Sequence, residues 1–107
     1  HGVDDGLIPA AFSSEPYVAA AKNIGRNVRY WRVYNAQHFD AFIGLPAWAN
    51  RYVPLMPYAY RALDAVWLHV STNAELPADA EIRTTPRASG ADGVSPLKEA
   101  NLGVWPR

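Results

Sequence analysis

The sequence contains no cysteine, and this absence excludes disulfide bonds and thiolate metal sites. It also has no excess of charge, since ten lysine and arginine residues balance ten aspartate and glutamate residues. Proteins that bind nucleic acid usually carry a basic excess on one face, so we expect no nucleic-acid partner. A run of about 18 apolar residues is absent as well, so we expect no membrane-spanning helix.

What is present is enough for one domain at most, with 107 residues and an ordinary hydrophobic fraction of 50%. The apolar pattern predicts a helix over residues 12–25, a strand over residues 27–34 and a helix over residues 57–72. A strand end, a helix and a strand within about 35 residues have the spacing of a βαβ unit, which implies a parallel sheet. The proline-rich segment 41–57 is expected to be mostly loop. Its apolar residues, among them Phe42 and Trp48, would either form the wall of an apolar substrate pocket beside His38 or pack under the next helix.

The helix predicted over residues 57–72 has an apolar stripe that the rest of the chain could cover only in part. The stripe consists of residues at spacings of four, three and four, namely Ala59, Leu63, Val66 and Val70. We therefore expect a larger body beside this helix. Trp31, Trp48 and Trp67 are interpreted as core residues rather than as ligand platforms.

Residues 73–107 differ from the preceding part because proline and glycine recur there without periodicity. This composition predicts an extended tail laid over a surface, with residues 87–95 disordered.

Two polar residues, Asp5 and His38, are each expected at the end of a strand. The functional loops of open α/β sheets lie at the carboxyl ends of the strands, so we expect these two side chains to meet. A histidine that exchanges protons near neutral pH beside a carboxylate is the arrangement found in Ser-His-Asp hydrolases. The pattern His-Gly-x-x-Asp favours Asp5 over Asp4. Spacing alone leaves an alternative, a solvated acidic turn and a surface histidine.

Other polar residues are interpreted as structural. Asp40 follows His38 closely and is expected to cap a turn, while His69 lies near a helix end, where a cation is favourable. Arg26, Arg29 and Arg32 are interpreted as solvated or ion-paired. No ligand spacing typical of zinc is present, so we expect no metal site.

Six segments give the chain a family resemblance, and the third of them is fairly specific. They are His1-Gly2-x-Asp4-Asp5-x-x-x-Pro9, Phe12-Ser13-Ser14-x-Pro16-Tyr17, Tyr34-Asn35-Ala36-Gln37-His38-Phe39-Asp40-Ala41-Phe42, Leu45-Pro46, Tyr52-Val53-Pro54-Leu55 and Ala62-Leu63-Asp64-Ala65. On these residues the chain resembles the D-3-hydroxybutyrate oligomer hydrolases, which are serine esterases of the α/β-hydrolase type. The resemblance is strong over residues 1–72 and weak in the tail.

The resemblance implies an α/β fold, the C-terminal portion of an α/β-hydrolase: the end of a parallel sheet, a crossover helix, the last strand, a C-terminal helix and an extended proline-rich tail. Residues 1–72 would belong to the catalytic domain and residues 73–107 would form the tail. It further implies hydrolysis of short 3-hydroxybutyrate oligomers, with His38 as general base and Asp5 as triad acid. No cofactor is needed, and a secreted or periplasmic location is favoured.

The nucleophile is missing, since no serine lies in a Gly-x-Ser-x-Gly elbow. Ser89-Gly90 is nearest but lacks the first glycine. We therefore expect an upstream part of the same enzyme to supply the serine, the isolated chain to be inactive, and the abrupt start at His1 to reflect a cut. Two alternatives stay open: another esterase of this fold, of tannase or feruloyl type, or a non-catalytic protein-binding fragment.

Overall fold

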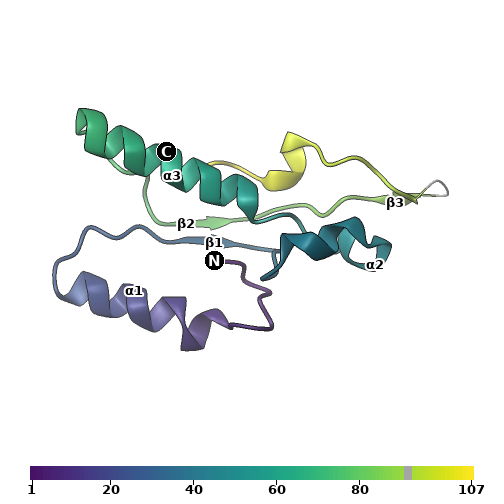
Figure 1. The fold of residues 1–107 in the computed structure, drawn as a ribbon, viewed down its shortest axis with the longest axis horizontal. Helices are drawn as coiled ribbons and strands as arrows, with labels where there is room; N and C mark the ends of the chain where they lie inside the picture. The colour runs from purple at the N-terminus through teal and green to yellow at the C-terminus, as the bar shows by residue number, and fades with distance from the viewer. Residues whose placement is uncertain (91–92) are drawn as a thin grey trace.

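The computed structural model describes residues 1–90 and 93–107, and Figure 1 shows their course. The longer elements are helix α1 (Ser14–Asn23), strand β1 (Trp31–Val33), helix α3 (Met56–Thr72) and strand β2 (Ala80–Ile82). The shorter elements are the 3-10 helices η1 (Ala10–Phe12), η2 (Asp40–Gly44) and η3 (Glu99–Leu102), helix α2 (Pro46–Ala49), and the strands β3 (Ser89–Gly90) and β4 (Gly93–Val94).

Strand β1 is the middle of three parallel segments. Strand β2 pairs with one edge of β1, with Ile82 opposite Val33. Residues 1–3 pair with the other edge, where the Val33 amide donates to the His1 carbonyl at 2.9 Å and the Val3 amide donates to the Val33 carbonyl at 2.8 Å. Because all three segments run parallel, their carboxyl ends lie at the same edge of the sheet.

Helix α1 connects residues 1–3 to β1, and α3 lies in the connection between β1 and β2. In Figure 1 the two strands run between α1 and α3. The parallel bridge between Gly2 and Val33 agrees with the βαβ spacing of residues 1–34. Gly2 is required there, because a Cβ atom would lie 2.4 Å from the Ala36 carbonyl oxygen.

Helix α3 begins and ends close to the predicted bounds. Pro57 occupies its first turn, where a missing amide hydrogen costs little. The Asp40 carboxylate accepts hydrogen bonds from the amides of Leu55 and Met56, both at 2.7 Å, and so satisfies free donors at the helix start. Asn73, with a φ of 59°, ends the helix in the left-handed conformation. The structural role predicted for Asp40 is confirmed.

Helix α1 is shorter than the range 12–25 predicted for it. Gly25, with a φ of 73°, lies just beyond its end, and the Arg26 amide donates to the Ala21 carbonyl at 2.9 Å, as a glycine stop allows. The Ser13 hydroxyl donates to the Pro9 carbonyl at 2.9 Å and does not cap the helix.

The structure differs from the sequence-based expectation in three segments. The strand predicted over residues 27–34 covers only Trp31–Val33, and it is not the last strand, because β2 lies in the segment expected to be an extended tail. Residues 41–57, expected to be mostly loop, contain most of η2 and all of α2. Residues 87–95, expected to be disordered, contain β3 and β4, with positions 91–92 outside the described residues. These elements are too short to produce a periodic pattern.

The buried core lies where β1, β2 and the start of α3 meet η3. Its residues are Val33, Ala36, Val53, Tyr58, Ile82 and Leu102. The Tyr58 hydroxyl donates to the Leu102 carbonyl at 2.7 Å and joins α3 to η3. Burial raises the pKa of Tyr58, so this hydroxyl stays a donor.

One side of α3 is left uncovered by the described chain, as the width of its apolar stripe predicts. This α3 outer face consists of Leu63, Val66, Trp67 and Val70, whose side chains are 50–75% exposed. Trp31 packs against the core and Trp48 is half-buried, but Trp67 is 73% exposed, so the interpretation of Trp67 as core is wrong within this chain.

Replacing Ile82 by Ala tests whether the tail is an integral part of the sheet. Ile82 is 2% exposed, so we expect the free energy of unfolding to fall by roughly 2 to 5 kcal/mol through lost burial and a cavity. Leu97→Ala is the control, since Leu97 also belongs to the tail but is 38% exposed. Equal effects of the two variants in urea unfolding would contradict the buried role of β2.

Candidate active site

The structure brings Asp5 and His38 together at the carboxyl edge of the sheet. The Asp5 Oδ2 atom lies 2.9 Å from His38 Nδ1. Asp5 follows the segment 1–3, and His38 follows β1 through a turn at Asn35, which has a φ of 52°. The Asp4 amide also donates to the Ala36 carbonyl at 3.2 Å, so the two turns are joined by backbone as well. Parallel pairing thus places both side chains at one edge.

The Asp5 carboxylate is buried, with 6% of the residue exposed. Its second oxygen, Oδ1, accepts hydrogen bonds from the amides of Leu7 at 3.0 Å and Ile8 at 2.8 Å. Burial by itself raises the pKa of this carboxyl, but the hydrogen bonds from Ile8, His38 and Leu7 outweigh burial, so the pKa of Asp5 lies below its ordinary value. Asp5 is therefore ionised at neutral pH and fixed in orientation.

The Nδ1 atom of His38 is bound to Asp5, and Nε2, on the other side of the ring, is directed away from it. With Nδ1 donating to the carboxylate, the neutral tautomer carries its lone pair on Nε2. About a third of the side chain, 32%, is exposed. Gln37 supports the turn, because its Oε1 accepts a hydrogen bond from the Gly6 amide at 3.3 Å. This arrangement can accept a proton at Nε2 while the carboxylate stabilises the resulting cation.

A hollow of about 430 Å³ adjoins His38. Its apolar lining comes from Leu7, Phe39, Phe42 and Trp48. Their aromatic rings form a continuous row from His38: Phe39 lies 4.6 Å from the imidazole centroid, Phe42 lies 5.7 Å from Phe39, and Trp48 lies 5.2 Å from Phe42. Such a surface suits an apolar ligand next to a proton acceptor.

Three residues that line the hollow, Leu7, Gln37 and Phe39, were not predicted from the sequence as part of the site. Gln37 is adjacent to His38 in the chain, so its neighbourhood was a usable signal. Leu7 is an exposed apolar residue in a turn, and nothing in its sequence pattern marks it.

Neither of the remaining histidines makes a hydrogen bond to Asp5 among the described residues. His1 Nε2 is 3.8 Å from Asp5 Oδ2, which is beyond hydrogen-bond distance. His69 Nδ1 contacts the Ala74 carbonyl at 2.6 Å near the end of α3. Within residues 1–90 and 93–107, no group of three or more potential metal ligands occurs.

The prediction that Arg26, Arg29 and Arg32 are solvated or ion-paired is confirmed. Arg32 pairs with Glu81 at 3.1 Å and with Glu15 at 3.4 Å, and Arg26 and Arg29 are exposed.

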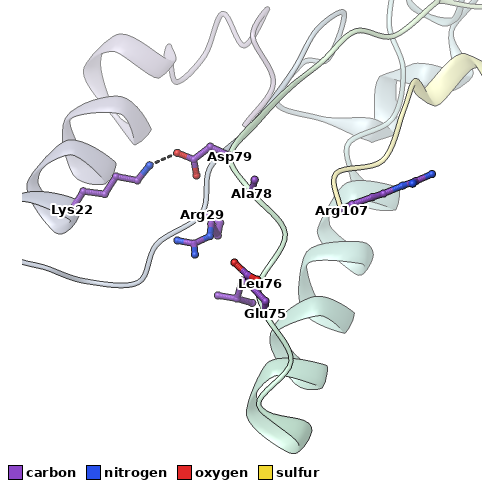
Figure 2. A pocket seen from close by; sticks show the side chains of 7 residues that line it. All are labelled: Lys22, Arg29, Glu75, Leu76, Ala78, Asp79 and Arg107. Atoms are coloured by element: carbon purple, nitrogen blue, oxygen red, sulfur yellow. Dashed lines mark hydrogen bonds and ion pairs between the residues drawn. The ribbon is translucent and has the colours of Figure 1, made fainter.

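A second hollow, of about 520 Å³, lies elsewhere and contains neither Asp5 nor His38 (Figure 2). Charged side chains line it, namely Lys22, Arg29, Glu75, Asp79 and Arg107. Lys22 forms an ion pair with Asp79, and mainly this contact lowers the pKa of Asp79. The Tyr30 amide also donates to Asp79, at 2.8 Å. These contacts join α1 to the segment before β2, so the hollow is explained by structural ion pairing.

The serines do not complete a triad within the described part of the chain. Ser13 donates to a carbonyl, Ser14 pairs with the Tyr30 hydroxyl at 2.6 Å, and Ser89 accepts from Asn50 at 2.9 Å. None of these hydrogen bonds involves His38. No helix among the described residues is long and apolar enough to cross a membrane.

Comparison with known proteins shows which class of protein the chain is similar to. Proteins named D-(-)-3-hydroxybutyrate oligomer hydrolase share 46% identity with it in Paracidovorax citrulli, 44% in Cupriavidus necator and 42% in Albidiferax ferrireducens. The matches cover 95%, 90% and 94% of this chain but only 15%, 14% and 15% of the relatives. The relatives are hydrolases by name.

The particular family follows from a family model, that of the 3HB-oligomer hydrolases, which matches residues 1–105. The chain belongs to this family. No solved structure matches it. The chain spans about 15% of the length of the curated relatives it matches.

Replacing Asp5 by Asn should lower the free energy of unfolding at neutral pH and change how that free energy depends on pH in acid. A lowered folded pKa means that Asp5 stabilises the fold fully above its ordinary pKa of 3.8, and that this contribution is lost as the pH falls through the folded value. We expect the free energy of unfolding of Asp5→Asn to be roughly 1.5 to 3 kcal/mol lower than that of the wild type at pH 7. This difference should shrink below pH 3.8.

Urea unfolding between pH 7 and pH 2.5 measures this difference. Asp4→Asn is the matched control, because Asp4 is the exposed neighbour of Asp5. If the free energy of unfolding of Asp5→Asn depended on pH as that of the wild type does, the stabilising role of the ionised Asp5 carboxylate would be contradicted.

Proposed function

We propose that this chain supplies the histidine and the aspartate of a Ser-His-Asp triad that hydrolyses esters of 3-hydroxybutyrate oligomers. The observation that carries the proposal is the 2.9 Å contact between His38 Nδ1 and the buried carboxylate of Asp5. Family membership supports the substrate class, because the relatives are named for these oligomers.

In this mechanism His38 Nε2 takes the proton from a serine hydroxyl as the serine oxygen attacks the ester carbonyl. Asp5 holds the imidazole in the required tautomer and stabilises the imidazolium. The imidazolium then gives its proton to the leaving alcohol, and the acyl group stays on the serine. His38 next deprotonates a water molecule, which attacks the acyl-enzyme carbonyl. As the acyl–serine bond breaks and the carboxylic acid is released, the imidazolium returns its proton to the serine oxygen. No cofactor enters the reaction.

The serine and the oxyanion hole would come from another part of the same enzyme. The α3 outer face supports this, because a body of apolar surface is needed to cover it. An apolar hollow of about 400 Å³ between β1 and α3 supports it too, with Trp31, Ala62 and Val66 among its lining. We infer that the sheet continues beyond residues 1–3 as an α/β-hydrolase sheet, of which this chain is the C-terminal portion.

Replacing His38 by Ala in the full-length enzyme tests the role of the histidine. We expect kcat for the 3-hydroxybutyrate dimer to fall by at least about a thousandfold, because removing the base leaves only binding and oxyanion stabilisation. His69→Gln is the control, since His69 lies near the end of α3 and its Nδ1 contacts the Ala74 carbonyl rather than Asp5 or His38. Both variants should keep the wild-type melting temperature within a few degrees.

Labelling with a fluorophosphonate locates the serine. The full-length enzyme should be labelled, labelling should be lost in His38→Ala, and the isolated 107-residue chain should stay unlabelled. Full turnover in His38→Ala would overturn the proposal and favour a non-catalytic binding fragment. A preference for galloyl or feruloyl esters over the dimer would favour the other esterase types.

A further inference from the structure

Arg87 lies in the segment after β2 and makes two hydrogen bonds that no sequence motif predicts. Its Nε donates to the Ala49 carbonyl at 3.2 Å, and its Nη2 donates to the Ile43 carbonyl at 3.1 Å. The side chain is half-buried.

The two acceptors lie at the ends of neighbouring short helices. Ala49 is the last residue of α2, and Ile43 is the penultimate residue of η2. Carbonyls at helix ends lack partners within the helix and carry partial negative charge. The planar guanidinium offers donors in a fixed fork, so one side chain satisfies both carbonyls and fixes η2 relative to α2.

A second contact joins the same two parts of the chain. The Asn50 Nδ2 atom donates to the Ser89 hydroxyl at 2.9 Å, one residue beyond α2 and two residues beyond Arg87. Figure 1 shows β3 and α2 at the same end of the molecule. The tail therefore contacts the η2–α2 segment through both Arg87 and Ser89.

Each carbonyl that Arg87 binds directly follows an aromatic residue of the hollow beside His38. Ile43 follows Phe42 and Ala49 follows Trp48. The rings of Phe42 and Trp48 lie 5.2 Å apart and both line the hollow. Fixing these two carbonyls fixes the two Cα positions from which the rings project. We define Phe42 and Trp48 as the aromatic wall.

We propose that Arg87 is a positioning residue that holds the aromatic wall as the binding surface for the extended chain of the substrate, and thereby sets a preference for oligomeric over short esters. The inference rests on the proposed function and deepens it. Each 3-hydroxybutyrate unit presents a methyl and a methylene group, which bury favourably against aromatic faces. An acetyl ester has too few carbon atoms to extend along the wall, so it gains little from it.

The test compares two substrates in the full-length enzyme, a 3-hydroxybutyrate trimer and ethyl acetate. In Arg87→Met we expect the ratio of kcat/KM for the trimer to kcat/KM for the acetate to fall about tenfold or more, mainly through KM for the trimer, because small displacements of a binding surface are costly. Arg87→Lys keeps the charge without the fork and should restore part of the ratio.

Arg83→Met is the matched control. Arg83 lies in the same tail, but its guanidinium is 3.6 Å from the ring centroid of Tyr34 and 3.0 Å from Glu81, away from the aromatic wall. Its substrate ratio should equal that of the wild type.

A double-mutant cycle separates positioning from general destabilisation. Phe42→Ala should lower the same ratio, and Arg87→Met combined with Phe42→Ala should lower it little further, because both changes remove one surface. Additive losses would mean that Arg87 acts by another route and would overturn the proposal.

The outcomes distinguish this inference from the proposed function. If the wild type hydrolyses the trimer, His38→Ala is inactive and Arg87→Met keeps the wild-type ratio, Arg87 has no positioning role and the triad stands. If the wild type does not hydrolyse the trimer, or His38→Ala keeps its activity, both proposals fall. Should Arg87→Met unfold, as its melting curve would reveal, Arg87→Lys decides: a wild-type ratio in that variant overturns the inference.

Discussion

The structure depends on the hydrogen bonding of β1 along both of its edges. Val33, which is 1% exposed, exchanges backbone hydrogen bonds with residues 1–3, while the Tyr34 amide donates to the Ile82 carbonyl at 3.0 Å on the other edge. A strand with both edges paired has a fixed direction and register. The turns that follow these parallel segments therefore meet at one edge of the sheet, which is how a carboxylate and an imidazole far apart in the sequence come within hydrogen-bond distance.

Hydrogen bonds from backbone amides and from the Asn35 side chain fix the site, in addition to the charge of Asp5. Asp5 receives two amide hydrogen bonds before it meets His38, so its orientation does not depend on the histidine. The turn that carries His38 is fixed in the same way: the carbonyl of Asn35 accepts from the Val53 amide at 2.7 Å, and its side chain donates to Thr84 at 3.1 Å. Such preorganisation suits a proton acceptor, because little rearrangement is then needed during a reaction.

The tail supports the rest of the chain at several levels. It supplies β2 to the sheet, Thr84 to the turn before His38, and Arg87 to the helices that carry the aromatic residues. The segment with the least regular sequence thus makes contacts on which the candidate site depends. A family model that matches residues 1–105 is consistent with this, since the matched region includes nearly all of the tail.

The sequence by itself determined α1, α3 and the meeting of Asp5 with His38. The spacing of apolar residues and terminal residues such as Gly25 predict the helices. Parallel pairing of strands brings the residues that follow neighbouring strands close together. Only the tertiary structure decided that residues 80–82 form a strand, that residues 46–49 form a helix and that Arg87 binds two distant carbonyls. Three- and four-residue elements carry no periodic signal, and a contact across some forty residues depends on where the whole chain places its ends, which local residue preferences do not encode.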